Sequence, residues 1–394
     1  MQRIYLDHAA TTATDPMVVK EMEIYFSQKY GNPNSIHSFG QETRQAIEEA
    51  RKKVAHLIGA EPSEIIFTSG GTEADNHAIK GVAWANQKKG KHIITSQIEH
   101  HAVLHSCRFL EKQGFKVTYL PVDKYGLIDP EELEKTINDQ TILITIMHAN
   151  NEIGTIEPIK EISEIARRRG IYFHIDAVQT VGHIPIKVKE LGVDMLSMSG
   201  HKFYGPKGVG ALYLKKGVKI FPLIDGGGQE KNRRASTENV PGIIGMGKAA
   251  ELAEERLKQG EEDRIAIMRD KLIKGISERV ENVHLNGHPT KRLPGNVNFC
   301  FEFVEGESIL LNLDMEGIAA SSGSACTSGS LEPSYVLLAI GLPHEIAHGS
   351  LRLSLGKENT EDEVDYVLEV LPQIIKKLRE LSPFKGNWKG LESR

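Results

Sequence analysis

The fold of this chain is decided by residues 142–179, which read ILITIMHANNEIGTIEPIKEISEIARRRGIYFHIDAVQ. A strongly apolar, β-branched run comes first, a helical stretch follows, and Gly170 separates that stretch from a second apolar run at residues 172–175. Strands that are buried on both faces have such continuous apolar runs, and a helix between two strands forces them to pair in parallel. The segment therefore predicts a β-α-β unit.

The same alternation of apolar runs and helical stretches extends along the chain on both sides of this unit. Further strands are predicted at residues 65–67, 92–95, 116–122 and 193–198. Residues 41–58 place their apolar side chains on one helical face, and Gly59 provides the helix stop. We therefore expect an α/β fold with a mostly parallel sheet that helices cover on both sides.

The pattern changes after a charged helical stretch at residues 249–257. An alternating strand is predicted at 296–303, a helix at 307–315 and a long amphipathic helix at 361–381. Because 394 residues exceed a single core of ordinary size, we expect two domains, a large α/β domain and a smaller α+β domain.

The composition narrows the cellular setting and the class of partner. Lysine and arginine number 48 and aspartate and glutamate 53, so the formal charge of −5 creates no general field that attracts nucleic acid or an anionic membrane. No stretch approaches the roughly 20 apolar residues of a membrane helix, and residues 1–16 lack the order of a signal peptide. The three cysteines, Cys107, Cys300 and Cys326, form no C-x-x-C pair, which disfavours a disulfide framework and an autonomous zinc site. We expect a cytoplasmic protein that binds neither nucleic acid nor membranes.

Polar segments follow five of the predicted strands directly. These segments are residues 68–73 (TSGGTE), 97–101 (QIEHH), 148–152 (HANNE), 176–179 (DAVQ) and 199–202 (SGHK). Open α/β sheets bind their ligands beyond the carboxyl ends of the strands, so we expect the active site there.

Four of these segments have both a structural and a functional interpretation. The glycines of residues 68–73 lead into a helix whose amides suit a phosphate, although a capped glycine turn is the simpler interpretation. Asp176 could cap a helix, or it could hold the ring nitrogen of pyridoxal phosphate in its protonated state. Lys202 could be a solvated lysine, or a desolvated amine that forms a Schiff base with an aldehyde cofactor. His100 could be structural, or it could stack on the cofactor ring and transfer protons near neutral pH.

Cys326 lies in a segment of small and polar residues, 321–330, which reads SSGSACTSGS. Most free cysteines are small buried hydrophobes, and Cys107 and Cys300 are predicted to be of this kind. The segment around Cys326 has no apolar face to bury, so its thiol is expected to be accessible and nucleophilic.

Together these motifs resemble the cysteine desulfurases of the NifS/IscS type, and the similarity runs from residue 5 to about residue 383. The sharpest elements are residues 199–202, 174–179 (HIDAVQ), and 321–335 with 352–356 (RLSLG). The resemblance implies a fold-type I pyridoxal-phosphate architecture, a homodimer with sites at the subunit interface, and a small domain built from both chain ends. The large domain would then comprise residues 13–257, and the small domain residues 1–12 and 258–394.

The resemblance also implies a role for each site residue. Lys202 would hold pyridoxal phosphate covalently, Asp176 would hold its pyridine nitrogen, and His100 would face its ring. The remaining contacts to the cofactor would come from Gly71, Thr72, Asn151, Gln179, Ser199, Gly200, His201 and, from the partner subunit, Thr237. Arg352 and Asn151 would receive the carboxylate of L-cysteine, since a guanidinium matches a carboxylate in two hydrogen bonds.

The implied reaction converts L-cysteine to L-alanine and leaves the sulfur as a persulfide on Cys326. The sulfur would pass to an iron–sulfur scaffold protein or another acceptor, and Cys326 would be a metal ligand only if a cluster is held transiently with a scaffold. A selenocysteine lyase and a class V aminotransferase on the same fold are alternatives. A non-catalytic sulfur carrier is a third, which the combination of Lys202, Asp176 and His100 disfavours.

Overall fold

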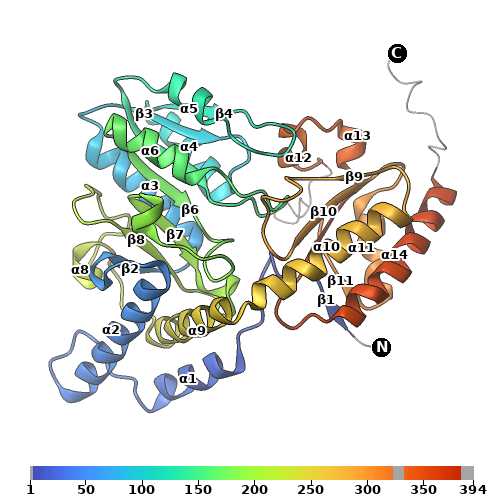
Figure 1. Cartoon of the computed structure of the whole chain (residues 1–394). Coiled ribbons are helices and arrows are strands. Elements are labelled where there is room, and N and C mark those ends of the chain that lie inside the picture. The colour runs from blue at the N-terminus through green and yellow to red at the C-terminus, as the bar shows by residue number, and fades with distance from the viewer. Residues whose placement is uncertain (1–2, 323–331, 383–394) are drawn as a thin grey trace.

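The computed structural model describes residues 3–322 and 332–382 (Figure 1). Its central feature is a seven-stranded sheet. The strands, in spatial order, are β2 (Ile65–Thr68), β8 (Gly210–Leu214), β7 (Met195–Ser199), β6 (Tyr172–Asp176), β5 (Thr141–Met147), β3 (His92–Ser96) and β4 (Lys116–Leu120). All neighbours pair in parallel except β8, which runs antiparallel to both β2 and β7. The predicted α/β fold with a mostly parallel sheet is confirmed.

Helices pack on both faces of this sheet, and each face has its own apolar cluster. On one face α3 (Gly71–Asn86) and α4 (His101–Glu111) cover side chains such as Ile66, Ile93 and Leu212. On the other face α2 (Ser38–Ile58), α6 (Ile159–Arg169) and α9 (Val240–Gln259) cover the alternate strand positions. The remaining helices of this part are α1 (Pro16–Ser27), α5 (Pro130–Thr136), α7 (Val188–Leu191) and α8 (Gln229–Asn232). The strands are therefore buried from both sides, which explains their continuous apolar sequences.

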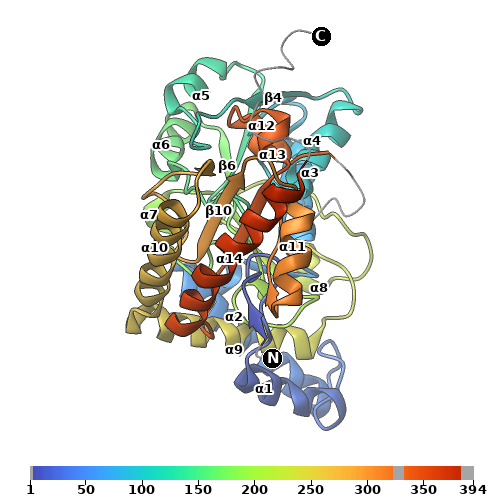
Figure 2. The same ribbon diagram turned by 90° about the vertical axis from the view of Figure 1, so that its right-hand side faces the viewer.

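The C-terminal part of the chain builds a second layer of strands and helices (Figure 2). One sheet has the order β12 (Ser350–Ser354), β10 (Asn296–Phe301) and β9 (Val283–Leu285), and all its pairs are antiparallel. In a separate pair, β1 (Ile4–Tyr5) lies parallel to β11 (Ile318–Ala319). The helices α10 (Glu261–Arg279), α11 (Gly306–Met315) and α14 (Glu361–Leu381) pack around these strands, and α12 (Tyr335–Ala339) and α13 (His344–Ala347) complete the part. The first strand of the chain thus belongs to a core that is otherwise C-terminal, whereas the domain boundaries after residues 12 and 257 stay predictions.

Two features of these strands were not predicted. β8 starts at Gly210, directly after a glycine-rich turn, and its apolar run is too short to stand out from that turn in the sequence. β10 has the predicted alternation, yet all six of its residues are buried. The side-chain amides of Asn296 and Asn298 both donate to the carbonyl oxygen of Glu152, at 3.0 Å each. The polar face of β10 is therefore covered by the loop after β5 instead of solvent.

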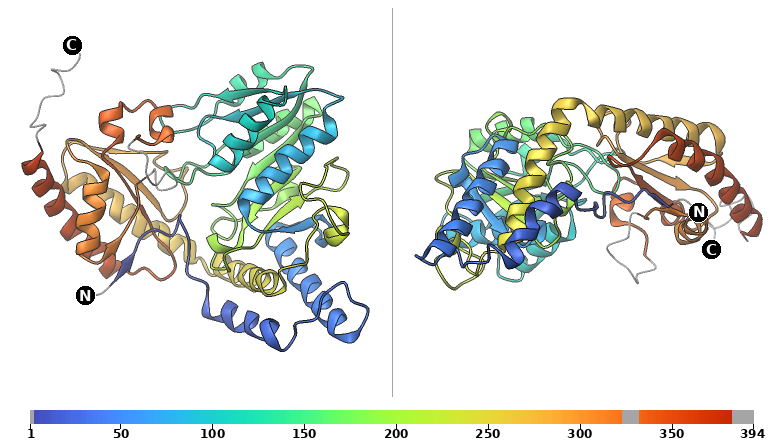
Figure 3. Two further views of the ribbon diagram at one scale, coloured as in Figure 1. Left: turned by 180° about the vertical axis from the view of Figure 1, so that it is seen from behind. Right: turned by 90° about the horizontal axis from the view of Figure 1, so that it is seen from below.

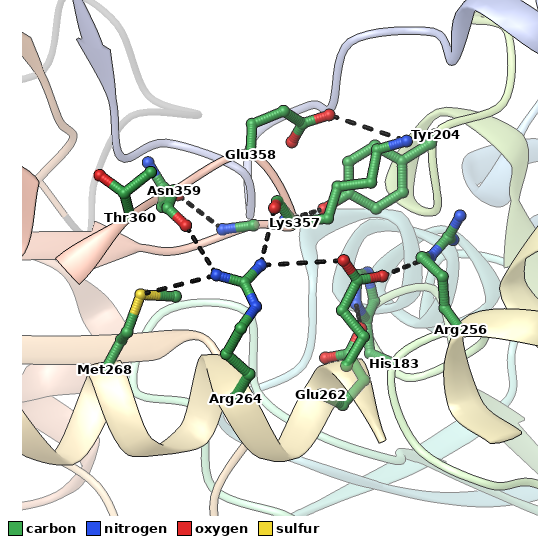
Figure 4. Close-up of polar contacts among 12 residues, drawn as sticks. His183, Tyr204, Arg256, Glu262, Arg264, Met268, Lys357, Glu358, Asn359 and Thr360 are labelled. Carbon is green, nitrogen blue, oxygen red and sulfur yellow. Dashed lines mark hydrogen bonds and ion pairs between the residues drawn. The ribbon is translucent and has the colours of Figure 1, made fainter. Parts of the chain in front are cut away.

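The helices α9 and α10 connect the two sets of sheets (Figure 3). Gly260 turns the chain between these helices with a φ of 70°. Next to this turn, Arg264 donates to the carbonyl oxygens of Lys357 and Asn359, at 2.8 and 2.9 Å (Figure 4). The Tyr204 hydroxyl accepts from the backbone amide of Lys357 at 2.8 Å. The Arg264 contacts hold α10 to the segment after β12, and the Tyr204 contact fixes that segment against the turn that follows β7. In the described ranges, no helix has both the length and the apolar character to cross a membrane.

Candidate active site

The carboxyl ends of β3, β5, β6 and β7 lie at one edge of the large sheet, and the polar segments predicted to form the site follow them there. Asp176 is the last residue of β6, and Lys202 ends a short turn, η2 (Gly200–Lys202), after β7. His100 is the N-cap of α4, beyond β3. A ring nitrogen of His100 and a carboxylate oxygen from each of Asp75 and Asp176 lie within 4.8 Å of one another. The fold therefore brings together residues that are about a hundred positions apart in the sequence.

A cavity of about 360 Å³ opens beside this edge, where α3 begins. It is lined by Thr11, Ser69, Gly70, Gly71, Thr72, Glu73, Ser199, His201, Lys207 and Gly208. The first amides of a helix have no partner within the helix and carry a partial positive charge, so they suit an anion. Packing around the turn is close, because a Cβ on Gly210 would stand 2.6 Å from the backbone of Gly70. The start of α3 therefore suits a phosphate in this cavity, and the one carboxylate in the lining, Glu73, is paired with Arg234 at 2.8 Å.

Four of the predicted phosphate contacts line this cavity, namely Gly71, Thr72, Ser199 and His201. Gly200 does not line it; its amide donates to the Val209 carbonyl at 3.0 Å, so it shapes the turn before Lys202. Thr237 is exposed and is absent from the lining of this cavity.

The Lys202 ammonium lies against the N-terminal segment of the chain. Its Nζ donates to the carbonyl oxygens of Ala9 and Ala10, at 2.6 and 2.8 Å. Gln179 also donates to the Ala9 carbonyl, at 3.0 Å. The Lys202 carbonyl is itself bonded to the His183 ring at 2.8 Å. Residues 9 and 10 thus position the amine through backbone oxygens, a contact that no side-chain motif could reveal.

Burial shapes the charges of Asp176 and His100. Burial raises the pKa of Asp176 to about 6. A hydrogen bond from the Val178 backbone amide and the positive charge of Lys202 both act to lower this pKa. Burial, together with Lys202 and His105, lowers the pKa of His100 to about 4, and its Nδ1 accepts from the Ala102 amide at 3.2 Å. Near neutral pH the edge therefore offers a buried carboxylate beside a neutral imidazole.

Arg352, on β12, brings a buried guanidinium to the same edge. It is 4% exposed, forms an ion pair with Asp7 at 2.9 Å and donates to the Asn151 carbonyl at 2.9 Å. Its Nε and the side-chain oxygen of Asn151 are both buried, and neither has a hydrogen-bond partner within the described ranges. Buried polar atoms are nearly always paired, so each of these two atoms has hydrogen-bonding capacity left for a polar ligand.

Of the three cysteines, Cys326 lies outside the described residues. Cys107 and Cys300 are both buried, as predicted. Burial raises the pKa of each thiol, that of Cys300 to about 12. Neither thiol has the exposure or the thiolate character of a nucleophile.

Comparison with known proteins places this site in a family. Residues 4–367 match the aminotransferase class-V model. The chain belongs to the aminotransferase class-V family. It is 61% identical to a protein of Dictyoglomus turgidum named cysteine desulfurase IscS, over 98% of both chains. It is also 61% identical to a protein of Methanosarcina thermophila with the same name, over 96% of this chain and 94% of that one.

Solved structures agree with this placement. A structure named NifS-like protein superimposes with a TM-score of 0.90 at 42% identity, over 96% of this chain and all of that one. A cysteine desulfurase from Thermococcus onnurineus superimposes with a TM-score of 0.86 at 28% identity, over 95% of each chain.

As a member of this family, the chain uses pyridoxal phosphate as its cofactor. The residues present fit it on observations of this structure: a cavity at a helix N-terminus for the phosphate, a buried carboxylate for the ring nitrogen and an amine for the aldehyde. The sequence motifs did not indicate Asp7, which orients Arg352, or Asp75, which lies beside Asp176. Asp75 lies inside α3 and not directly after a strand, so its position became visible only with the fold.

We predict that His100 of the cofactor-free chain titrates near pH 4. A folded pKa below the ordinary 6.5 means that the unfolded chain binds the proton first, so the stability from neutral His100 is complete above about pH 6.5 and falls on acidification toward 4. NMR titration of ¹³C-labelled histidines measures this, with His100→Gln identifying the signal. A His100 midpoint near 6.5 would contradict the prediction.

Proposed function

We propose that this chain is a cysteine desulfurase that converts L-cysteine to L-alanine and carries the sulfur as a persulfide on Cys326. The observation that carries the proposal is the set of Lys202, Asp176 and Arg352 at one edge of the sheet, in a chain 61% identical over nearly its full length to proteins named cysteine desulfurase. Family membership alone would leave the reaction open.

The cofactor would be held at three points. Gly71, Thr72, Ser199 and His201 would bind the phosphate, Asp176 would pair with the pyridine nitrogen, and Lys202 would attach at the aldehyde. His100 would lie over the ring, Gln179 would bind its phenolic oxygen, and Gly200 would support the turn. When bound, pyridoxal phosphate supplies an electron sink for bonds broken at the substrate α-carbon.

The chain's own residues would bind the substrate and move its protons. Arg352 and Asn151 would receive the substrate carboxylate, with the unpaired Arg352 Nε and the Asn151 side-chain NH2 as donors toward it. Lys202 would take the proton from the α-carbon, and neutral His100 would be available to transfer another.

The thiolate of Cys326 would attack the substrate sulfur. A sulfur–sulfur bond forms as the carbon–sulfur bond breaks, the bonding pair of that bond goes to carbon, and a proton there completes alanine. The net balance is cysteine and enzyme thiolate giving alanine and a persulfide anion, because the proton added at carbon is matched by the one that the substrate thiol loses.

We further propose a homodimer in which Thr237 of the partner subunit completes each phosphate site. In one subunit Thr237 is exposed, on the segment that Arg234 ties to the cavity wall through its ion pair with Glu73 at 2.8 Å. The sulfur would pass to a scaffold protein for iron–sulfur cluster assembly, in keeping with the IscS name of the relatives.

Cys326→Ala is predicted to keep the visible absorption of the bound cofactor but to form no alanine from cysteine, because the sulfur has no acceptor thiol. Alanine release and intact-mass detection of the persulfide measure this. Cys107→Ala, a change at a buried thiol, is the matched control and should retain both. Undiminished alanine formation by Cys326→Ala would remove that thiol from the mechanism, and amino transfer to a keto acid would favour an aminotransferase.

Arg352→Lys is predicted to raise the KM for cysteine by roughly tenfold or more, because an ammonium cannot form the paired hydrogen bonds that a guanidinium offers and charged hydrogen bonds contribute about 1.5–3 kcal/mol. Steady-state kinetics measure KM and kcat separately. The matched control is Arg264→Lys, a guanidinium at the α9–α10 turn that bonds carbonyl oxygens away from the site. An unchanged KM would exclude the proposed role of Arg352.

The holoenzyme is predicted to sediment at about twice the mass of one chain. Thr237→Ala should leave this mass unchanged and weaken cofactor affinity, since only the phosphate contact is lost. Sedimentation velocity and cofactor titration of the cofactor-free protein check both statements. A monomeric, fully active holoenzyme would refute the shared site.

A further inference from the structure

Three carboxyl groups are buried together behind the cofactor edge. Asp75 is 1% exposed, Asp176 6% and Glu99 0%. They come from three elements, since Asp75 lies in the second turn of α3, Asp176 ends β6, and Glu99 follows β3. Burying an ionised carboxylate is costly unless a cation or several hydrogen bonds compensate it. The number of negative charges that this cluster can hold is therefore limited.

The positive groups around the cluster are few. His174 lies 3.7 Å from Asp75, but its two ring nitrogens are bonded to the hydroxyls of Thr145 and Ser197, at 2.8 and 2.9 Å. Burial lowers the pKa of His174 to about 3 and that of His100 to about 4, so both rings are neutral near pH 7. Among residues 3–322 and 332–382, the remaining cation that acts on Asp176 is the Lys202 ammonium. One ammonium does not balance three buried carboxylates.

Of Asp176 and Glu99, Asp176 ionises at the lower pH. Asp176 accepts from the Val178 amide at 3.0 Å and feels the charge of Lys202, and both favour its ionised form. Glu99 accepts from the Ser96 hydroxyl at 2.6 Å and the Met147 amide at 3.0 Å, yet burial raises its pKa to about 8.

Asp75 is the least compensated of the three. Its Oδ1 is buried and has no hydrogen-bond partner in the parts of the chain that the structure describes. Burial and the charge of Asp176 raise its pKa well above the ordinary range, and the Ser197 hydroxyl offsets this only in part. Two carboxyl groups at such close range cannot both ionise, as in enzymes with a pair of aspartates that share one proton.

We propose that Asp75 is a positioning residue that holds a proton beside Asp176, so that the negative charge of the pair resides on Asp176. The inference rests on the proposed function, because the charge on Asp176 matters for holding the pyridine nitrogen. The opposite distribution, with the proton on Asp176, would leave that nitrogen without an anionic partner. Asp75 lies one helical turn from Gly71. The first amides of α3 would therefore bind the phosphate, and Asp75 in its second turn would set the charge of the Asp176 carboxylate that pairs with the pyridine nitrogen.

Infrared spectroscopy of the cofactor-free protein, labelled with ¹³C-aspartate, tests the location of the proton. We expect the band of a protonated aspartic acid at pH 7.5 in the wild type and in Asp176→Asn, and its loss in Asp75→Asn. Label confined to aspartate excludes Glu99 from the signal. Absence of the band from the wild type, or its loss in Asp176→Asn alone, would overturn the proposal.

The pH dependence of stability gives a second readout. The folded pKa of Asp75 lies above its unfolded value, so its favourable contribution is complete below the unfolded pKa and is lost as pH rises through the folded one. Asp75→Asn should therefore lose less stability than the wild type as pH rises above about 4, the ordinary aspartate pKa, measured as the shift of the denaturation midpoint. Equal slopes in the two proteins would count against a retained proton.

Cofactor affinity separates this role from a loss of structure. Asparagine mimics the protonated acid, so Asp75→Asn should bind pyridoxal phosphate within about threefold of the wild type, whereas Asp176→Asn should bind at least tenfold more weakly, on the scale of one pKa unit for a lost charge. Equally weak binding by both variants would overturn the assignment. The infrared result is independent of turnover, so failure of the desulfurase assay alone would leave it intact.

Discussion

The burial of the Asp176 carboxylate at the end of β6 is the constraint on which the site depends. The sheet buries β6 between neighbours on both sides, and the carboxyl group at its end has little contact with water. A charge in that position needs a positive partner, which Lys202 supplies at a distance and a protonated ring nitrogen would supply directly. The same constraint makes the neighbouring carboxyl of Asp75 keep its proton. Cofactor binding and the protonation of the surrounding acids therefore depend on each other through the charge of Asp176.

The two ends of the chain close this site from the same side. Residues 9 and 10 bind the Lys202 amine, and Asp7 orients Arg352 on β12. The pairing of β1 with β11 and the bridge between Asp7 and Ser354 hold the N-terminal segment against the C-terminal layer. Because Asp7 occupies one terminal nitrogen of the guanidinium, the fork of Arg352 is already oriented before a substrate carboxylate arrives. Such preorganisation lowers the entropic cost of binding.

Sequence patterns predicted the fold well because its strands are buried on both faces and are separated by glycine-capped helices. Gly59 and Gly170 both end their helices in the left-handed conformation, as their positions suggested. Site residues at or just beyond the end of a strand, such as Asp176 and Lys202, could be predicted for the same reason. Backbone donors and acceptors were not: the carbonyls of Ala9 and Ala10 carry no side-chain signature. Asp75 was missed because an acid inside a helix is usually solvated, and only the packing of α3 against the sheet makes this one buried.

The cysteines show how packing assigns reactivity within one chain. A sulfur carrier needs a thiol that ionises near neutral pH and can be reached from solvent. Cys107 lies in the apolar cluster under α3 and α4, and Cys300 faces Asn286 inside the C-terminal layer, with an amide donor at 3.1 Å. Burial raises the pKa of both thiols, so ionising either would place a charge in a nearly dry interior. A mechanism that needs a thiolate in this chain must therefore draw on Cys326, whose small and polar neighbours in the sequence offer no apolar core to enclose it.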